Sequence, residues 1–550
     1  MQARHGGQIL VDQLATEGVE RVFSVPGESF LAVLDGLHGS GIQNVVCRQE
    51  GGAAMMASAH GKLTGAPGVA LVTRGPGATN ASAGVHVAMQ DAAPMVLLVG
   101  QIARGHRDRG AFQEVDYRRF FAPLAKWVAE IDDPHRIPEY VGRAFHLAVS
   151  GRPGPVVLAL PEDMLSAEAV VGNLARATRP DQAVAPAHAA RIAGALARAE
   201  RPLVIAGGPA WSGAAAADLE RFAAAWDLPV AVAFRRQDYM DNDHPCYAGD
   251  LGVGMNPRLA LRLREADCLL VLGAGLGDIE TGGYAHVDPA EPGKSILHVH
   301  PDPDTPGSVY RPDIALAAPA PALVAELAGN SAPAAPAWVN WRHAAREDYL
   351  HWQTPVDLPG AVRMADAVCH LREVLPREAI LTNGAGNYAA FVHRYHRFRE
   401  HGTQLAPSSG SMGYGLPAAV AAKLAHPDRP VICFAGDGCF QMTGQEFSTA
   451  MQYRANIVVI VANNGIYGTI RMHQERAYPG RVSGTTLANP DFAALARAHG
   501  GHGETVETQA AFAPALDRAL AAGVPAIIEL KLDPEALSTA QTLSEVRARG

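Results

Sequence analysis

Cysteine is scarce in this chain and follows no recognisable pattern. Several of the six cysteines lie inside apolar stretches, where a reduced thiol packs as a small hydrophobic side chain. Their spacing matches neither a disulfide framework nor a zinc site. The six are Cys47, Cys246, Cys268, Cys369, Cys433 and Cys439.

Long hydrophobic runs and an excess of basic residues are also missing. No apolar run approaches the ~20 residues of a membrane-spanning helix, and residues 1–18 lack the apolar core of a signal peptide. We therefore expect a cytoplasmic protein with no membrane partner. The formal net charge of −9 provides no basic surface for nucleic acid, so small molecules are the expected partners.

Charged residues are few, at 18%, whereas hydrophobic residues make up 48% of the chain. This balance is typical of a globular enzyme with large buried surfaces. The 550 residues exceed the ~250–300 to which a single core grows, so we expect three domains.

Strand and helix patterns alternate along the chain. Short apolar runs such as 69–73 and 268–272 end in glycine-containing turns and are followed by helical patterns. This alternation predicts α/β domains with doubly wound parallel sheets. Two segments rich in alanine and proline separate them, so we expect domains at 1–165, 190–330 and 355–540.

One βαβ unit carries the clearest chemical signal. An apolar strand ends in Gly436-Asp437-Gly438, and after a helix a second strand ends at Asn463-Asn464. A right-handed crossover makes these strands parallel, so Asp437 and Asn464 lie at the same carboxyl edge of the sheet, where open α/β sheets bind ligands.

Oxygen atoms at that edge suit Mg²⁺, which commonly takes one or two side-chain ligands and leaves the rest to phosphates and water. Gly436 and Gly438 let the backbone approach phosphate oxygens, and the following helix adds an N-terminal dipole. The alternative is an ordinary strand-end turn in which Asp437 caps the helix.

The GDG at 436–438 and the NN at 463–464 resemble the thiamine-diphosphate-binding motif of the acetolactate synthase and 2-oxoacid decarboxylase superfamily. The resemblance covers nearly the full chain and implies a pyrimidine-binding, a middle Rossmann-like and a diphosphate-binding domain. It implies Asp437, Asn464 and the carbonyl of Ile466 as metal ligands. Thiamine diphosphate and Mg²⁺ are the implied cofactors, with Gly436 and Gly438 at the diphosphate.

Glu50 is the candidate catalytic carboxyl. It stands at the carboxyl end of a predicted strand, with no lysine or arginine on its helix until Lys62. Desolvation there would favour the protonated form and suit proton exchange near neutral pH. The residues alone favour a solvated helix cap, but the resemblance implies that Glu50 hydrogen-bonds N1′ of the aminopyrimidine and activates the cofactor. Gln49 stands where the family often has histidine.

Further loops resemble cofactor-binding parts of the family. In the run GSMGYG from Gly410, small residues allow close contact with a flat ring, although a glycine-rich packing helix is the alternative. By resemblance, the carbonyl of Gly410 binds the pyrimidine amino group and Met412 lies beneath the cofactor. We also expect Pro26 and Gly27, in the turn after the first strand, to contact the cofactor.

The runs Thr73–Gly84 and Phe112–Asp116 resemble the acetolactate synthase pattern closely. By resemblance, Gln113 lies by the reacting centre, and Phe112 and Lys126 lie near the substrate. Helix surface and core packing are the alternative interpretations.

The acceptor side departs from the biosynthetic acetohydroxyacid synthases. Their acceptor-binding arginine, in a GARFDDR run, is absent from residues 273–279, and their acceptor-side tryptophan falls at His473. We therefore expect an altered choice of acceptor, with Thr469 and His473 as candidate substrate contacts. Arg471 and Arg476 are alternatives, and each is also explained as a surface or loop residue.

Two glycine-rich loops raise the question of a second cofactor. GAGLGD at 273–278 superficially resembles a dinucleotide fingerprint, which is a weak signal. This run and GDLGVG at 249–254 are similar to loops that hold FAD in acetolactate synthases. FAD is thus an open expectation, and a dinucleotide-binding oxidoreductase is the alternative from a different functional class.

The predicted function is a thiamine-diphosphate-dependent carboligase that decarboxylates a 2-oxo acid and transfers the acyl-anion equivalent to a carbonyl acceptor. A benzaldehyde-lyase-like aldehyde lyase and a simple 2-oxoacid decarboxylase are alternatives. Glu50 and the metal ligands come from different domains, which by resemblance belong to different subunits. We expect a homodimer as the minimum and a homotetramer as the assembly.

Overall fold

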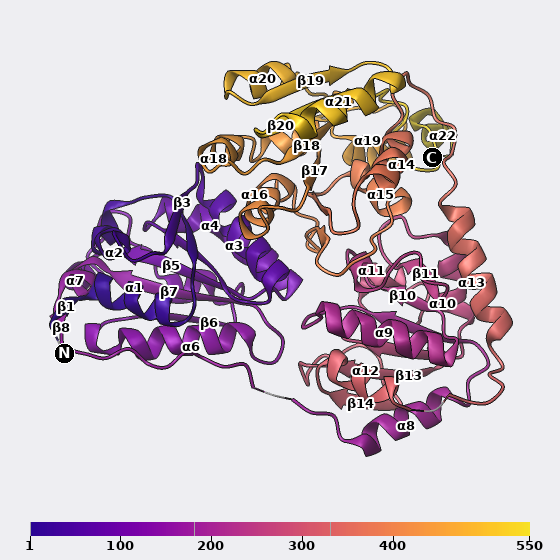
Figure 1. The fold of residues 1–550 in the computed structure, drawn as a ribbon, viewed down its shortest axis with the longest axis horizontal. Coiled ribbons are helices and arrows are strands. Elements are labelled where there is room, and N and C mark those ends of the chain that lie inside the picture. The colour runs from indigo at the N-terminus through magenta and orange to yellow at the C-terminus, as the bar shows by residue number, and fades with distance from the viewer. Residues whose placement is uncertain (1, 181, 331, 550) are drawn as a thin grey trace.

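The computed structural model describes residues 2–180, 182–330 and 332–549, which form three α/β units (Figure 1). Each unit contains one six-stranded sheet whose strands are all parallel. The predicted fold class, three doubly wound parallel-sheet domains, is confirmed. None of the helices in the described part of the chain combines the length and apolarity needed to cross a membrane.

The first unit, drawn in indigo and violet in Figure 1, has the sheet order β3-β2-β4-β5-β7-β6. Its strands are β2 (Arg21–Ser24), β3 (Gln43–Val46), β4 (Gly68–Val72), β5 (Met95–Gln101), β6 (Trp127–Glu130) and β7 (Pro155–Pro161). Its helices are α1 (Gly6–Thr16), α2 (Leu31–Leu37), α3 (Glu50–Thr64), α4 (Pro76–Asp91), α5 (Tyr117–Phe121), α6 (Ile137–Val149) and α7 (Glu162–Ser166). A short antiparallel pair, β1 (Arg4–His5) and β8 (Glu168–Ala169), joins its two ends.

The middle unit has the order β11-β10-β9-β12-β13-β14, which is the Rossmann order 3-2-1-4-5-6 when its strands are numbered along the chain. Its strands are β9 (Pro202–Ala206), β10 (Val230–Val232), β11 (Tyr247–Asp250), β12 (Cys268–Leu272), β13 (Ser295–His300) and β14 (Ile314–Ala317). Its helices are α8 (Pro186–Leu196), α9 (Gly213–Trp226), α10 (Pro257–Glu265), α11 (Asp278–Thr281) and α12 (Ala320–Ala328), and α13 (Val339–Trp352) leads to the third unit.

The third unit repeats the strand arrangement of the first, with the order β16-β15-β17-β18-β20-β19. Its strands are β15 (Ile380–Asn383), β16 (Gln404–Leu405), β17 (Val431–Gly436), β18 (Val458–Asn463), β19 (His502–Val506) and β20 (Ala526–Lys531). Its helices are α14 (Met364–Val374), α15 (Asn387–Tyr395), α16 (Gly415–Ala425), α17 (Asp437–Gln441), α18 (Glu446–Gln452), α19 (Gly468–Ala477), α20 (Phe492–Ala498), α21 (Gln509–Ala521) and α22 (Leu543–Arg549).

The central strands are buried on both faces. Along β17, Ile432 and Phe434 enter one hydrophobic cluster, whereas Val431 and Cys433 enter another. The second cluster continues into the first unit, because the alanine-rich helices α3 and α16 pack closely against each other. The first and third units therefore share one core, and the N-terminus of α3 is held against the third unit.

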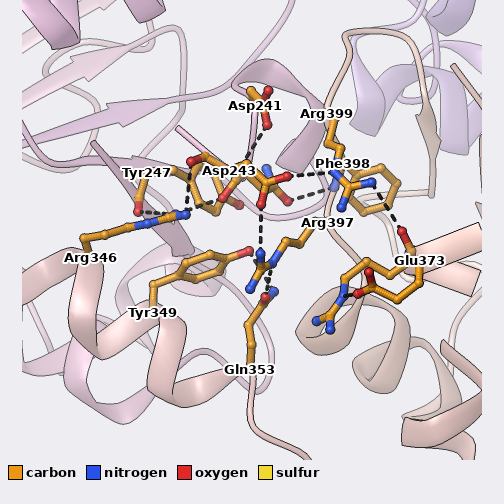
Figure 2. A network of polar contacts seen from close by, with 12 residues as sticks. Asp241, Asp243, Tyr247, Arg346, Tyr349, Gln353, Glu373, Arg397, Phe398 and Arg399 are labelled. Atoms are coloured by element: carbon orange, nitrogen blue, oxygen red, sulfur yellow. Dashed lines mark hydrogen bonds and ion pairs between the residues drawn. The ribbon is translucent and has the colours of Figure 1, made fainter. Parts of the chain in front are cut away.

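The middle and third units are joined by the ionic network of Figure 2. Asp243 of the middle unit accepts hydrogen bonds from Arg397 (2.8 Å) and Arg399 (2.7 Å) of the third. Burial raises the pKa of Asp243, but these two guanidinium groups outweigh it and hold that pKa below its ordinary value. The network fixes the middle unit against the loop that precedes β16.

One local expectation is wrong, and several strands were not predicted. The single helix predicted after Gly438 is divided into α17 and α18, because the Thr443 hydroxyl bonds the carbonyl of Gly413 (2.6 Å) and Gly444 follows in the turn. The short edge strands β6, β14 and β19 were not predicted: β19 (HGETV) lacks an apolar run, and the apolar residues of β14 (IALA) continue into the alanine- and proline-rich segment that follows.

Candidate active site

The predicted site residues follow strands at the switch points of the first and third sheets. In a parallel sheet of order 2-1-3-4-6-5, the strand order reverses between strands 1 and 3. This switch point leaves a crevice at the carboxyl ends of the two strands. These strands are β2 and β4 in the first unit and β15 and β17 in the third. One chain thus presents two crevices of the same kind.

The crevice of the third unit opens into a cavity of about 240 Å³. Among its lining residues are the predicted Gly410, Met412, Gly436, Asp437, Gly438, Asn464, Ile466 and Thr469. The remaining wall comes from α14, from the segment after β15, from the start of α19 and from residues 532–537. All residues that line this cavity in the described chain belong to the third unit. A second cavity of about 260 Å³, at the junction of the three units, is lined by none of the predicted residues.

Asp437 is buried at the N-terminus of α17. Its Oδ1 accepts from the N–H of Gly438 (2.8 Å), and its Oδ2 accepts from the N–H of Gly465 (2.8 Å) and from Nδ2 of Asn489 (2.8 Å). Burial raises the pKa of Asp437 above its ordinary value, although these donors favour the ionised form. A divalent cation beside this carboxylate would offset the cost of burying its charge.

The two asparagines that follow Ala462 have different surroundings. Asn463 is fully engaged, because its Nδ2 donates to Oε1 of the buried Glu529 (2.5 Å) and its Oδ1 accepts from Asn489 (2.9 Å). Asn464 lines the cavity, and its Oδ1 accepts from the N–H of Ile466 (3.2 Å). The second asparagine is therefore the one whose oxygen is placed to bind a group in the cavity.

Gly436 and Gly438 lie so close to aromatic rings that a side chain at either position would crowd them. A Cβ on Gly438 would lie 2.4 Å from Cε1 of Tyr467, and a Cβ on Gly436 would lie 3.0 Å from Cδ1 of Tyr388. Both tyrosines line the cavity. The absence of side chains at these two glycines thus allows their backbone and the two tyrosine rings to form the same cavity wall.

Gly410 and Met412 reach the cavity on a loop that the first unit holds. Gly410 has φ +67°, a left-handed conformation that favours glycine. Upstream, the N–H of Ser408 donates to Asp91 Oδ1 (2.8 Å), and Lys62 Nζ donates to the carbonyl of Ala406 (2.6 Å). Residues of α3 and α4 therefore set the position of this loop.

Glu50 begins α3 and lies with other predicted residues at the first switch point. Its Oε2 accepts from Asn80 Nδ2 (3.0 Å), and its Oε1 lies 3.3 Å from the place that a Cβ of Gly77 would occupy. The carboxyl is only half-buried, so the desolvation expected from the sequence is not reached within one chain. Nearby, the predicted turn Pro26-Gly27 packs on Thr73, 2.4 Å from a Cβ built on Gly27.

The third unit anchors the turn before Glu50. Glu446 of α18 accepts from the N–H groups of Arg48 (3.1 Å) and Gln49 (3.0 Å), and Gly52 has no Cβ to clash with its carboxyl. Burial raises the pKa of Glu446, and hydrogen bonds from Thr449 and the two backbone groups favour its ionised form. This contact lies at the interface between α3 and the third unit.

The substrate residues predicted from the first unit are dispersed. Gln113, at φ +65°, lies against Gly75 at the first switch point, where a Cβ on that glycine would approach it to 2.8 Å. The side chain of Phe112 is 75% exposed. Lys126 instead donates to the carbonyls of Leu147 (2.5 Å) and Ser150 (2.6 Å), which end α6. Its ammonium group is thus engaged in capping a helix.

The candidate substrate residues on α19 lie in different places. Thr469 lines the cavity, and its hydroxyl exchanges two hydrogen bonds with Asn387, which lines it too. His473, one turn later, is exposed and lies outside the cavity lining. Arg471 is engaged with the hydroxyl of Thr485 (2.7 Å).

The GAGLGD run lacks the context of a dinucleotide fingerprint. Such a run follows the first strand of the unit and opens a full helix, whereas Gly273–Asp278 follows β12, the fourth strand, and leads into α11 of four residues. Its residues Ala274 and Leu276 are buried in the core of the middle unit. Packing therefore accounts for Ala274 and Leu276 in this run.

Three residues at the site were missed because they have no local signal. Asn489 and Glu446 lie in ordinary helix and turn contexts, and Asn80 lies within a run that was compared only as a whole. Each is brought to the site by a contact with a residue far away in the sequence.

Comparisons with known proteins match all three units. The family models described as "Thiamine pyrophosphate enzyme" match as an N-terminal TPP binding domain over 4–120, a central domain over 189–327 and a C-terminal TPP binding domain over 384–530. The chain is 30% identical over 537 residues to the acetolactate synthase isozyme 2 large subunit of Escherichia coli, covering 96% of each chain. It is 31% identical over 514 residues to the acetolactate synthase large subunit of Corynebacterium glutamicum, covering 90% of this chain and 81% of the relative.

A third relative matches the chain to a similar extent. The chain is 29% identical over 548 residues to the probable acetolactate synthase large subunit of Methanocaldococcus jannaschii, covering 96% and 92% of the two chains. Since these matches span all three units and nearly the whole chain, the chain belongs to the thiamine pyrophosphate enzyme family, as its GDG and NN motifs predicted.

Proposed function

We propose that this chain is a thiamine-diphosphate-dependent carboligase of acetolactate-synthase type. It decarboxylates a 2-oxo acid and transfers the acyl group to a carbonyl acceptor. The observation that carries this proposal is the single cavity in which Gly410, Met412, Asp437 and Asn464 converge, in a chain that aligns over 96% of its length with an acetolactate synthase large subunit.

The cavity fits Mg²⁺ and a diphosphate. Asp437 and Asn464 supply a carboxylate and an amide oxygen, the hard ligands that Mg²⁺ prefers, and the carbonyl of Ile466 is the proposed third ligand. Gly436 and Gly438 line the cavity and carry no side chain that would crowd Tyr388 and Tyr467, so phosphate oxygens could approach their backbone. Burial raises the pKa of Asp437, and a cation beside it would favour the ionised carboxylate.

When bound, thiamine diphosphate would supply the nucleophilic carbon and the electron sink that decarboxylation of a 2-oxo acid needs. The chain orients that group and moves protons. We assign Met412 and Gly410 to holding the cofactor's rings, and Glu50 to the proton exchange that activates it. Gln113, close to the first switch point, is assigned to the reacting centre.

We propose a homodimer as the minimum active unit and a homotetramer as the assembly. Among the described residues, those that line the cavity around Asp437 all belong to the third unit, whereas Glu50, Gly27 and Gln113 lie at the switch point of the first unit. A second copy that places its first unit over this cavity would supply Glu50 and complete its burial. Two copies related by a twofold axis would form two identical sites.

Gly438→Ala tests the diphosphate wall. We expect thiamine diphosphate with Mg²⁺ to bind about 10-fold more weakly, because the new methyl group must displace Tyr467 from the cavity wall. Isothermal titration measures the Kd. The matched control is Gly275→Ala, since a Cβ at Gly275 meets no atom within 4 Å. Equal Kd values for the two variants would contradict the assignment.

The proposed reaction is tested by supplying the purified protein with thiamine diphosphate, Mg²⁺ and a panel of 2-oxo acids. We expect release of CO₂ with formation of a 2-hydroxy ketone or 2-hydroxy-3-oxo acid, identified by mass. Release of no CO₂ from any member of the panel would overturn the proposal.

An aldehyde acceptor, or an aldehyde lyase, is the second candidate. The middle unit has no arginine in residues 273–279, and His473 lies exposed outside the cavity, so neither supplies a contact for a second carboxylate. Products formed only with added aldehydes, or cleavage of benzoin without CO₂, would favour this candidate. CO₂ release with free aldehyde as the sole product indicates a simple decarboxylase.

FAD and the cytoplasmic location stay predictions. The loops 249–254 and 273–278 that suggested FAD lie in the middle unit. The absorption spectrum and mass of the small molecules released by denaturing the protein test FAD and thiamine diphosphate together.

A further inference from the structure

A segment far from the motifs lies across the turn that carries Asn464. We define residues 483–490 as the strap. The N–H of Tyr467 donates to the carbonyl of Thr485 (2.9 Å), and the N–H of Leu487 donates to the carbonyl of Gly465 (2.8 Å). Ile466 and Thr486 form an antiparallel bridge between these bonds. The strap thus runs along the turn and places Asn489 beside Asp437 and Asn463.

The side chain of Asn489 connects the ends of β17 and β18. Its Nδ2 donates to Oδ2 of Asp437 (2.8 Å) and to Oδ1 of Asn463 (2.9 Å). Its Oδ1 accepts from Nε2 of Gln441 (2.9 Å). Because an ionised carboxylate only accepts hydrogen bonds, the amide nitrogen must face Asp437, and the orientation of Asn489 is fixed.

These bonds make the two oxygens of Asp437 unequal. Oδ2 receives two donors, from Gly465 and Asn489, whereas Oδ1 receives one, from Gly438. A carboxylate oxygen has two lone pairs, so Oδ2 is saturated and Oδ1 keeps one lone pair. Asn489 therefore determines which oxygen is available to a cation.

The same amide holds Asn463 away from the cavity. Asn463 is bonded to Asn489 on one side and to Glu529 on the other, and it is Asn464 that lines the cavity. Asn489 itself does not line the cavity. Its effect on a bound group must therefore pass through Asp437 and the turn.

We propose that Asn489 is a positioning residue that presents Oδ1 of Asp437 to Mg²⁺ and fixes the spacing of the two ligand-bearing strand ends. This inference rests on the proposed function, because it assumes Mg²⁺ and thiamine diphosphate in the cavity. Partners that orient metal ligands typically change metal affinity by about 10–100-fold when removed.

The test compares Asn489→Ala with the unaltered full-length protein. Calorimetric titration of MgCl₂ at a fixed concentration of thiamine diphosphate measures the Mg²⁺ concentration for half-saturation, and CO₂ release at saturating Mg²⁺ measures kcat. We expect half-saturation to rise about 10–100-fold and kcat at saturating Mg²⁺ to stay within about threefold. A residue that only maintained the fold would lower kcat without recovery at high Mg²⁺.

Two further variants keep the test decisive. Gln441→Ala removes the bond that orients Asn489 and is expected to raise half-saturation by less, which covers the case in which Asn489→Ala folds poorly. Thr486→Ala is the matched control, because Thr486 belongs to the strap and its hydroxyl bonds Arg471 rather than Asp437. We expect no change for this control.

The outcomes separate this inference from the proposed function. If the unaltered protein binds Mg²⁺ and thiamine diphosphate and both Asn489→Ala and Gln441→Ala bind them equally well, the inference alone is overturned. If the unaltered protein binds neither, the proposed function falls and the inference falls with it. An increase that Thr486→Ala shares would assign the effect to the strap and overturn the role of the Asn489 amide.

Discussion

Thiamine diphosphate in the presence of Mg²⁺ is expected to bind the Asp437→Ala variant at least about 100-fold more weakly than the unaltered protein. Asp437 is the only proposed ligand with a negative charge, and it lies buried at the cavity wall. Its loss removes a metal ligand and leaves the N–H groups of Gly438 and Gly465 without their acceptor. Calorimetric titration of the cofactor at fixed Mg²⁺ measures the change.

Asp437→Asn is the control that separates charge from folding. Burial raises the pKa of Asp437 in the folded protein, so its stabilising contribution is full below the unfolded pKa and is lost as pH rises through the folded pKa. Without metal, the ionised carboxylate thus lowers the stability of the folded protein at neutral pH. The amide removes that destabilising charge and keeps one acceptor oxygen, which can serve either Gly438 or Gly465 but not both.

Relative to that of the unaltered protein, the thermal midpoint of Asp437→Asn should therefore be most favourable at about pH 7.5 with chelator present. This advantage should shrink as the pH falls. Cofactor binding should nevertheless be weakened, because the ligand charge is gone. Tight binding by both variants would remove Asp437 from the proposed metal site.

The Glu50→Gln variant should bind thiamine diphosphate with a Kd within about threefold of the unaltered protein and lose turnover by about 10²–10⁴-fold. Glutamine preserves the volume at the start of α3 and can still accept from Asn80. It cannot exchange the proton that cofactor activation needs. Calorimetry gives the Kd, and CO₂ release gives kcat.

Asn80→Ala is the matched control for this variant, because it removes the hydrogen bond and leaves the carboxyl in place. We expect a much smaller loss of kcat for it. Turnover by Glu50→Gln at the unaltered rate would exclude Glu50 from the mechanism, and equal losses in the two variants would assign the effect to the hydrogen bond.

Mixing the two variants tests the proposed dimer. If each site takes Glu50 from one copy and Asp437 from the other, co-expressed Glu50→Gln and Asp437→Ala chains form mixed dimers with one intact site. Random pairing of equal amounts would restore about a quarter of the unaltered activity. If both residues served a site within one chain, no pairing would restore activity.

Much of the fold could be read from the sequence because its central strands are buried on both faces. Runs such as those of β4, β12 and β17 are continuously apolar, and they end in turns that a local pattern reveals. An edge strand such as β19 consists mostly of polar, half-buried or exposed residues and has no comparable signal. Its pairing depends on the neighbouring strand rather than on its own composition.

The cofactor motif was equally visible, because its parts are contiguous and each follows a strand. Asp437 and Asn464 come from adjacent parallel strands, β17 and β18, so their meeting followed from the βαβ connection alone. The lysine and histidine proposed near the substrate had only a resemblance in their favour. In the structure Lys126 caps α6 and His473 is exposed.

The sequence by itself determined the family, the three parallel-sheet units and the residues Glu50, Asp437 and Asn464 as candidates. Only the tertiary structure decided what supports them. Asn489 reaches Asp437 across the strap, and Glu446 anchors the turn before Glu50 from another domain. Such contacts join residues that are distant along the chain, and no local pattern encodes them, because they arise only when separate units pack together.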